Sequence, residues 1–238
     1  MKQHVSASQI KTFRACARKW FWENVRGHRS PDTRSTLLGK EIHRLLEEYL
    51  ATGTVPTPSP QFPEAWDICL PGLENLPPPI VPRRQIERAF WLTCFGKPVY
   101  GFIDLIQSAA KITDHKSTSD FRYARSTRDL ESDPQALLYA CVGPHLWHNE
   151  PNGTRYDNPV TVIARPHEGP VEFEHVYYRT RNAPRSMVTK VVLTRGHLDR
   201  GLARIDATIA DMVEASTKEP GEVCPNLTAC VDYGGCSH

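Results

Sequence analysis

The sequence predicts an α/β fold in which a mixed central β-sheet is flanked by helices. Two amphipathic segments with helical spacing begin the chain, and three strand-like segments rich in β-branched and aromatic residues follow. A helix separates these strands from a second group of strands, and an amphipathic helix comes last. Such alternation is typical of an α/β sheet. With 238 residues the chain can bury one sizeable core, so we expect a single domain over residues 1–238.

The composition sets limits on partners and location. The 29 basic and 27 acidic residues leave a net charge of +2, which neither demands nor excludes nucleic acid, because a local patch is enough. No apolar run approaches the roughly 18 residues that a membrane span needs, so no membrane partner is expected. The residues after Met1 contain no apolar signal core, and this predicts a cytoplasmic protein.

The first third of the chain is predicted to be helical. Residues 6–24 have apolar side chains on one helical face, and Ser6 with Gln9 resembles a capping box. Residues 36–50 repeat the helical pattern. Residues 56–82 contain nine of the twenty prolines, and this composition predicts an irregular segment on the surface.

The rest of the chain alternates between strands and helices. The predicted strands cover residues 84–95, 98–107, 111–116, 159–165, 171–179 and 187–194. Gly96-Lys97 is expected to join the first two strands as a tight hairpin. Asp133-Pro134 predicts a helix start, and Gly143-Pro144 is expected to stop that helix at about Val142. Residues 196–215 predict the last helix.

Two charged residues are expected on one face of the third strand. Asp114 and Lys116 are two positions apart, so they point to the same side, roughly 6.6 Å apart along the strand. A three-residue loop at 108–110 would place Asp104 directly opposite Asp114, whereas a loop of even length would place them on opposite faces. This spacing predicts a polar cluster on the sheet.

The preceding hairpin adds a third carboxylate to this cluster. A turn at Gly96-Lys97 places Asp104 opposite Ala89, with Glu87 one diagonal away on the same face. Three carboxylates so close together resist joint ionisation unless a cation lies among them, and oxygen ligands favour Mg²⁺ or Mn²⁺. The alternative is that these residues are solvent-facing charges on an ordinary antiparallel sheet.

Asp104 followed by Asp114-His115-Lys116 in an apolar strand resembles the core motif of the PD-(D/E)XK nuclease superfamily. Asp occupies the middle acidic position, and the proline of the motif is absent. Other segments resemble the RecB-like exonuclease branch, which includes the CRISPR-associated RecB-like nucleases. These segments are Ser8-Gln9-Ile10 with Cys16-Ala17-Arg18-Lys19-Trp20, then Gly39-Lys40-Glu41-Ile42-His43, then Gln135-Ala136-Leu137-Leu138-Tyr139. They follow the order of that branch over nearly the whole chain.

The resemblance implies a restriction-endonuclease-like core and a set of site residues. The implied metal ligands for Mg²⁺ or Mn²⁺ are His43, Asp104, Asp114 and the backbone carbonyl of His115. A catalytic role is implied for Lys116, and Glu87 would support the metal directly or through water. Gln135 and Tyr139 share a helix face, and they would contact DNA or the groups around the site. The alternatives are a structural helix histidine at His43 and simple core packing at Tyr139.

The last residues of the chain contain a cluster of cysteines. Cys224, Cys230 and Cys236 have the spacing C-x₅-C-x₅-C, and Cys16 is a candidate fourth ligand. The resemblance implies a [4Fe–4S] cluster that clips the cysteine-rich tail to the N-terminal helix, so that 1–24 and 216–238 together form the cluster region. The first gap is five residues where the family commonly has two, and tetrahedral zinc is the competing interpretation. The other cysteines, Cys69, Cys94 and Cys141, are expected to be packing residues.

Together these features predict a metal-dependent DNA exonuclease that prefers single strands or frayed ends. Arg122, Arg125 and Arg128 follow the catalytic strand, with aromatic residues between them, and would grip a strand through phosphates and stacking. A solvated, mobile loop is the alternative for this segment. Two rival functions are a non-catalytic nuclease-like DNA-binding or adaptor subunit and a sequence-specific endonuclease. The expected partners are DNA, proteins of a recombination, repair or CRISPR-type complex, and further copies of this chain.

Overall fold

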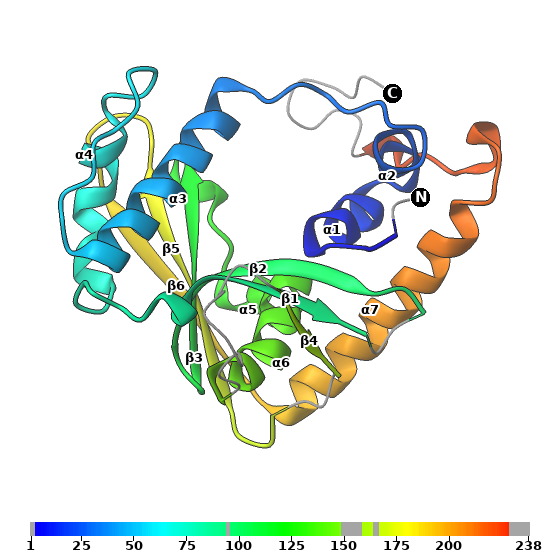
Figure 1. The fold of residues 1–238 in the computed structure, drawn as a ribbon. Helices are drawn as coiled ribbons and strands as arrows, with labels where there is room; N and C mark the ends of the chain where they lie inside the picture. The colour runs from blue at the N-terminus through cyan, green and yellow to red at the C-terminus, as the bar shows by residue number, and fades with distance from the viewer. Residues whose placement is uncertain (1–2, 94–95, 149–158, 164–166, 229–238) are drawn as a thin grey trace.

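The computed structural model describes residues 3–93, 96–148, 159–163 and 167–228. The described chain forms a mixed six-stranded sheet in the order β4-β1-β2-β3-β5-β6 (Figure 1). The strands are β1 (Ile86–Leu92), β2 (Val99–Ser108), β3 (Lys111–Thr118), β4 (Val160–Val162), β5 (Val171–Arg179) and β6 (Ser186–Leu193). Pairing is parallel for β1–β4 and β3–β5 and antiparallel for the other neighbours. The predicted α/β class with a mixed sheet is confirmed.

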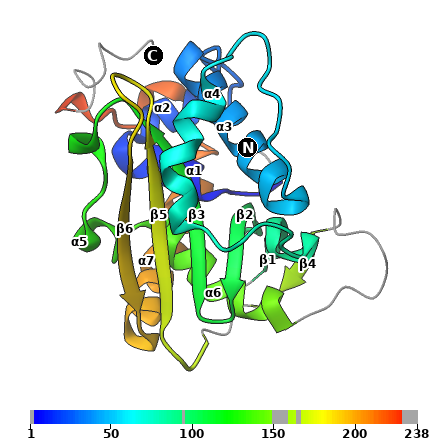
Figure 2. The same cartoon turned by 90° about the vertical axis from the view of Figure 1, so that its left-hand side faces the viewer.

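Helices cover both faces of this sheet (Figures 1 and 2). The α-helices are α1 (Ala7–Ala15), α2 (Ala17–Asn24), α3 (Arg34–Thr52), α4 (Ala65–Cys69), α5 (Thr127–Leu130), α6 (Pro134–His148) and α7 (Arg195–Ala215). Short 3₁₀ helices are η1 (Leu70–Asn75), η2 (Arg83–Gln85), η3 (Phe121–Tyr123) and η4 (Pro220–Glu222). None of the helices in the described ranges is long and apolar enough to cross a membrane.

Strand β5 shows how the two layers of helices are divided. Its side chains alternate between the two faces, as they do in any strand. Val171 and Phe173 are buried in the main core, to which α6 and α7 contribute. Val176 and Tyr178 are buried with residues of α3 and α4 on the other face. The sheet therefore lies between two helical layers, and α1 and α2 join the layer of α6 and α7.

The expectation of one helix over residues 6–24 is wrong, because the helix breaks at Cys16. This residue has extended backbone angles, φ −159° and ψ 109°, and separates α1 from α2. The side chain of Ser6 caps α1 by accepting a hydrogen bond from the N–H of Gln9, as the capping pattern predicts. The break lets the apolar side chains of both short helices, among them Ile10 and Phe21, reach the same core.

The expectation that 56–82 is only an irregular surface segment is also wrong. This segment contains α4 and η1, and Phe62 and Trp66 are buried against α3. Prolines fit here because they stand outside the helix or in its first turn, as Pro71 does in η1. Composition alone did not reveal the buried aromatic residues between the prolines.

The end predicted for the helix that follows Asp133 is wrong, although its start is confirmed. Asp133 Oδ1 accepts hydrogen bonds from the N–H groups of Gln135 and Ala136 at 2.7 and 3.3 Å, as an N-cap does. The helix then continues to His148 with Pro144 inside it. A Cβ atom at Gly143 would lie 2.4 Å from Ile112 Cδ1, so α6 packs tightly onto β3 at this point. Burial of the helix compensates for the hydrogen bond that the proline removes.

The register predicted for β1 and β2 is corrected by two residues. Ile86 pairs with Leu105 and Arg88 pairs with Ile103, so Glu87 lies directly opposite Asp104, and Ala89 lies opposite Phe102. The connection between the strands is longer than the predicted two-residue turn at Gly96-Lys97, because the pairing stops at Leu92 and Val99. This correction brings two carboxylates closer together than the diagonal that the sequence suggested.

Candidate active site

One histidine and two carboxylates meet where α3 crosses the sheet. His43 on α3, Glu87 on β1 and Asp104 on β2 each offer a ligand atom, and these atoms all lie within 4.8 Å of one another. His43 Nδ1 lies 3.4 Å from Asp104 Oδ2 and 3.9 Å from Glu87 Oε1. Two carboxylates with one imidazole form a donor set that suits a divalent cation such as Mg²⁺ or Mn²⁺. We call these three residues the acid–histidine group.

Backbone geometry at Glu87 is unusual for a strand. Its φ is +48°, in the left-handed region that residues other than glycine seldom adopt. Such a conformation costs about 1–3 kcal/mol and persists only where the surrounding structure enforces it. Its neighbours Ile86 and Arg88 are both paired with β2, so the ladder holds the strained residue in place beside Asp104.

A close approach of α3 to the sheet places His43 in the site. A Cβ atom at Gly39 would lie 2.9 Å from Ser117 Oγ, so α3 lies close to β3 at this glycine. His43 lies four residues after Gly39 and therefore on the same face of the helix. The small residue and the histidine of this segment thus act together: the first lets the helix reach β3, and the second projects toward Asp104.

Asp104 is held by the backbone of the neighbouring strand. Leu105 and Thr113 are the last paired residues of β2 and β3 on this side. Next to this pair, Asp104 Oδ2 accepts a hydrogen bond from the N–H of His115 at 2.7 Å. Burial, with the nearby charge of Asp114, raises the pKa of Asp104 to about 7. Burial alone would lower the pKa of His43, but Asp104 and Glu87 outweigh it and raise that pKa to about 9.

Asp114 is buried beside this group and is held by other side chains. Its Oδ1 accepts a hydrogen bond from Gln135 Nε2 at 2.6 Å, and its Oδ2 is ion-paired with Lys116. Burial raises the pKa of Asp114, but the charge of Lys116 outweighs this effect and holds the pKa below its usual value. The charges of Asp114 and Asp104 raise the pKa of Lys116 against the effect of burial. The ammonium group therefore stays protonated.

Residues of α6 connect Asp114 to α1. Gln135 Nε2 also donates to Tyr139 Oη at 3.1 Å, and Lys11 Nζ donates to Gln135 Oε1 at 3.2 Å. Tyr139 is buried and packs edge-on against Phe90, and burial raises its pKa well above the usual value. The predicted pair Gln135 and Tyr139 thus shares one face of α6 and lies against the carboxylate of β3.

These residues line one cavity of about 410 Å³ between the start of α1, β2 and α6. Asp104, Lys116, Gln135 and Tyr139 line it, as does Lys11, whose side chain is partly buried. We call this cavity the catalytic pocket, because the candidate catalytic residues Asp104 and Lys116 line it. Aromatic side chains continue from it along the sheet: Tyr100 also lines the pocket, and the neighbouring ring of Phe102 is 45% exposed.

The side chain of His115 points away from Asp114 toward α3. Its Nδ1 lies 3.3 Å from Tyr178 Oη, and its ring meets that of His43 edge-on at 5.9 Å between centroids. Burial, with the charge of His43, lowers the pKa of His115 to about 3, so this imidazole is neutral. The implied role of the His115 carbonyl as a metal ligand stays a prediction, whereas the N–H of the same residue donates to Asp104 Oδ2.

Two site residues, Lys11 and His175, were not found from the sequence. Lys11 Nζ lies 2.9 Å from Asp133 Oδ2, at the N-terminus of α6. His175 on β5 is the parallel partner of Asp114, and its Nε2 lies 3.5 Å from Asp114 Oδ2. A polar residue inside the buried strand 171–179 was the only signal for His175, and it gains meaning only once β5 is known to pair with β3.

The three arginines after the catalytic strand have different surroundings. Arg122 is exposed and lies over the ring of Tyr123. Arg125 Nε lies 3.2 Å from Asp133 Oδ2, and its N–H donates to Tyr177 Oη at 2.9 Å. Arg128 lines a second cavity. The segment thus contains the short helices η3 and α5. The three arginines are spread along it and do not form a single cluster.

The described part of the cysteine region shows contact between the two ends of the chain. The N–H of Asn226 donates to Cys16 Sγ at 3.4 Å, and Arg18 Nε donates to the carbonyl of Val223 at 2.8 Å. Cys16 is buried and Cys224 is exposed. Cys230 and Cys236 lie outside the described residues, and no cysteine pair or clip is seen within them.

Comparisons with known proteins bear on the N-terminal sequence and on the fold. A model of the PD-(D/E)XK nuclease superfamily matches residues 4–74, which include α1, α2 and the segment of α3 with His43 but end before Asp104. No curated protein matches the chain. The crystal structure of a protein of Eubacterium rectale described as a "putative exonuclease" matches with a TM-score of 0.55 and 12% sequence identity. The match covers 94% of this chain and 84% of that protein. The chain is therefore similar to PD-(D/E)XK nucleases in its N-terminal sequence and to this described exonuclease in the fold of nearly its whole length.

Proposed function

We propose that this protein is a metal-dependent nuclease of the PD-(D/E)XK superfamily, and that it acts as a DNA exonuclease of the RecB-like branch. The observation that carries the proposal is that Asp104 of the acid–histidine group and Lys116 of the Asp114–Lys116 pair line the same cavity. The family match over residues 4–74 and the fold of the described exonuclease support it.

The donor set fits a hard divalent cation, Mg²⁺ or Mn²⁺. His43, Glu87 and Asp104 would hold the ion, with Asp114 and the carbonyl of His115 as further ligands. Without a cation, burial and the nearby charge of Asp114 together raise the pKa of Asp104. When bound, the ion lowers the pKa of a water molecule and offsets charge on the scissile phosphodiester.

The chain's own residues supply positioning and charge. Lys116 carries a protonated ammonium group at the pocket wall, where it would stabilise the negative charge that develops on the phosphate. Gln135 fixes the orientation of Asp114 through the 2.6 Å hydrogen bond. Lys11 lies at the same pocket and would draw the substrate's phosphate toward it.

The preference for single strands or frayed ends rests on the aromatic side chains near the pocket. Trp91, Tyr100 and Phe102 follow one another with ring centroids 4.6 and 5.2 Å apart. Unpaired bases can stack on such rings with a gain of about 1–3 kcal/mol per base, and paired bases cannot. The net charge of +2 offers no broad positive field to hold duplex DNA instead.

We also propose a [4Fe–4S] cluster with Cys16, Cys224, Cys230 and Cys236 as ligands. The support is that residues 221–226 already lie against α1 and α2 through hydrogen bonds from Arg18 and to Cys16. A cluster would add a covalent link to this contact and tie the tail to the N-terminal helices. Stoichiometric zinc in place of iron would identify a zinc clip.

Digestion of end-labelled DNA with Mg²⁺ or Mn²⁺ tests the proposed activity. An exonuclease releases short labelled products early from single strands and frayed duplexes, and more slowly from blunt duplexes. Discrete internal bands would identify a sequence-specific endonuclease. Stable binding without any degradation would identify a non-catalytic DNA-binding subunit.

A further inference from the structure

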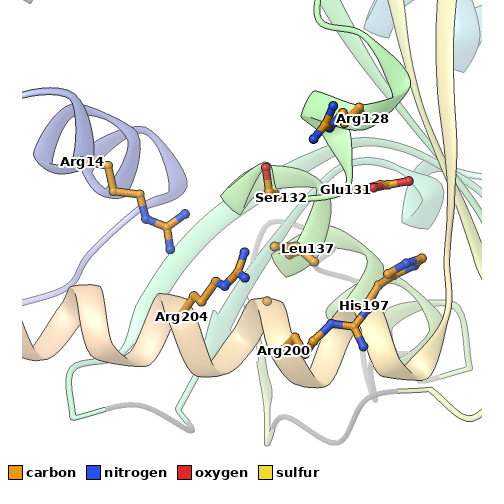
Figure 3. A pocket seen from close by; sticks show the side chains of 9 residues that line it. Arg14, Arg128, Glu131, Ser132, Leu137, His197, Arg200 and Arg204 are labelled. Carbon is orange, nitrogen blue, oxygen red and sulfur yellow. The ribbon is translucent and has the colours of Figure 1, made fainter.

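A second cavity, of about 500 Å³, lies outside the catalytic pocket between α1, the turn from α5 to α6, and α7 (Figure 3). Basic side chains dominate its lining: Arg14, Arg128, His197, Arg200 and Arg204. Glu131 is the one carboxylate among its lining residues in the described part of the chain. We call this cavity the arginine pocket.

The arginines of this pocket lack the carboxylate partners that neighbouring arginines have. On the same helix, Arg195 Nε lies 2.9 Å from Asp199 Oδ1. By contrast, none of the four pocket arginines lies within 4.0 Å of a carboxylate oxygen of the described residues. Arg14 Nε instead donates to the hydroxyl of Thr208 at 3.1 Å. The pocket therefore holds more positive charge than its one carboxylate, Glu131, offsets, and an added anion would balance the excess.

Close packing of α7 against α6 forms the wall of this pocket. A Cβ atom at Gly201 would lie 2.5 Å from both methyl groups of Leu137, so α7 lies directly against α6 at the wall of the pocket. Arg200 and Arg204 flank this contact on α7, and Arg14 approaches from α1 (Figure 3). Burial and the charge of Arg204 lower the pKa of Arg14, which shows that the two guanidinium groups repel each other.

A phosphate group matches this arrangement. Guanidinium groups bind phosphate oxygens through two parallel hydrogen bonds, and several of them together suit an anion with three or four oxygens. The volume of about 500 Å³ has room for a phosphate with part of its nucleotide. The pocket is open to solvent, and Arg128, Arg200 and Arg204 are exposed, so a strand can enter it.

The two pockets share helices α1 and α6 in their linings. Lys11 lines the catalytic pocket and Arg14 lines the arginine pocket, one turn apart on α1. Likewise Leu138 lines the first and Leu137 the second on α6. We propose that the arginine pocket binds a phosphate of the nucleic-acid strand whose reacting phosphodiester lies in the catalytic pocket. This inference rests on the proposed nuclease function.

Binding of DNA by the metal-free protein tests the inference separately from cleavage. The probe is a fluorescein-labelled single-stranded 20-mer in EDTA, followed by anisotropy at several salt concentrations. We expect the R200A/R204A variant to bind about tenfold more weakly than the wild type. The slope of the logarithm of the binding constant against the logarithm of the salt concentration is negative. Its magnitude should be smaller by about 1.4 in the variant, since each lost phosphate contact removes about 0.7 for single strands. The matched control is R195A, which removes one arginine of α7 outside the pocket and should stay within twofold of the wild type.

Two further experiments identify which phosphate is bound and control for misfolding of the double variant. Oligonucleotides with a 5′-phosphate, a 3′-phosphate or hydroxyl ends distinguish a terminal phosphate from an internal one. If the double variant loses a preference for one phosphorylated end, the pocket binds that end, and equal losses on all probes indicate an internal phosphate. The R200K/R204K variant keeps the charge but not the paired hydrogen bonds, so its affinity should lie between the wild type and R200A/R204A.

The result that overturns the inference is an R200A/R204A variant that binds all probes within twofold of the wild type at every salt concentration. Wild-type protein that binds DNA but degrades none with Mg²⁺ or Mn²⁺ would contradict the proposed nuclease function. Because binding is measured without metal and degradation with it, the two failures are distinguishable.

Discussion

Asp114 on β3 and His175 on β5 are direct partners in the parallel pairing, with Asp114 Oδ2 and His175 Nε2 3.5 Å apart. His175 Nδ1 lies 3.0 Å from Tyr177 Oη, which accepts a hydrogen bond from the N–H of Arg125. The tyrosine hydroxyl is then free to donate to Nδ1, and this places the imidazole proton on Nε2, facing Asp114. Burial lowers the pKa of His175 to about 4, so the ring is neutral. The arginine-bearing segment is thus linked to the proposed metal site.

We therefore expect His175 to be a positioning residue for Asp114. His175→Phe removes the donor beside the carboxylate, and kcat for DNA degradation should fall about tenfold or more with little change in KM, as for groups that orient metal ligands. His175→Gln retains a donor and should recover part of kcat. A purely structural histidine would instead lower the melting temperature of both variants without this division between kcat and KM.

Lys116 and Asp114 should be needed for the chemistry. Lys116→Ala removes the ammonium group beside the reacting phosphate, and Asp114→Asn removes the charge that Lys116 and Gln135 orient. Each change should lower kcat by at least about 10²-fold, the effect of losing one group that stabilises transition-state charge. The matched control is Lys190→Ala on the exposed side of β6, whose rate should be unchanged. Near wild-type activity of K116A in Mn²⁺ would contradict the assignment.

The fit of α6 onto β3 predicts a pair of coupled substitutions. Gly143→Ala places a methyl group 2.4 Å from Ile112 Cδ1, and this overpacking should lower the free energy of unfolding by about 1–3 kcal/mol. Ile112→Val removes the clashing Cδ1 atom. The double variant should therefore be more stable than the sum of the two single changes, as measured by chemical denaturation. If the effects of the two single changes on the free energy of unfolding are simply additive in the double variant, the contact between residues 143 and 112 is not the cause of the destabilisation.

Metal analysis of the purified protein tests the cysteine proposal. Protein prepared without oxygen should contain iron and sulfide near four each per chain. Cys16→Ser should remove the iron and destabilise the chain, because Cys16 lies at the break between α1 and α2 and contacts the C-terminal segment. Cys69→Ser, a change at a buried cysteine of α4, is the control and should retain the iron. Stoichiometric zinc without iron would show that the cysteines form a zinc clip and not a [4Fe–4S] cluster.

Local signals predicted much of this fold and of its site. The strand containing Asp114 and Lys116 puts both side chains on one face, and their ion pair confirms this. The cap at Asp133 and the helical spacing of Gln135 and Tyr139 also follow from neighbouring residues. These features depend on contacts within a few residues, and periodicity describes such contacts well.

Long-range geometry set the features that the sequence did not predict. The β1–β2 register depends on the length of the connection between the strands. A register shift of two residues places Glu87 opposite Asp104 and not on the diagonal. His175 pairs with Asp114 across 61 positions of sequence, through a parallel contact that no turn specifies. Pro144 stays inside α6 because tertiary burial outweighs the local penalty.

The most direct test of the central claim is the Mn²⁺ dependence of DNA degradation by Glu87→Gln. The substitution keeps the shape of a residue in the acid–histidine group but removes its charge, so the Mn²⁺ concentration for half-maximal rate should rise about tenfold or more. Glu74→Gln, at an exposed glutamate of η1, serves as the control and should match the wild type. A Glu87→Gln variant with the Mn²⁺ dependence and rate of the wild type would contradict a catalytic cation held by His43, Glu87 and Asp104.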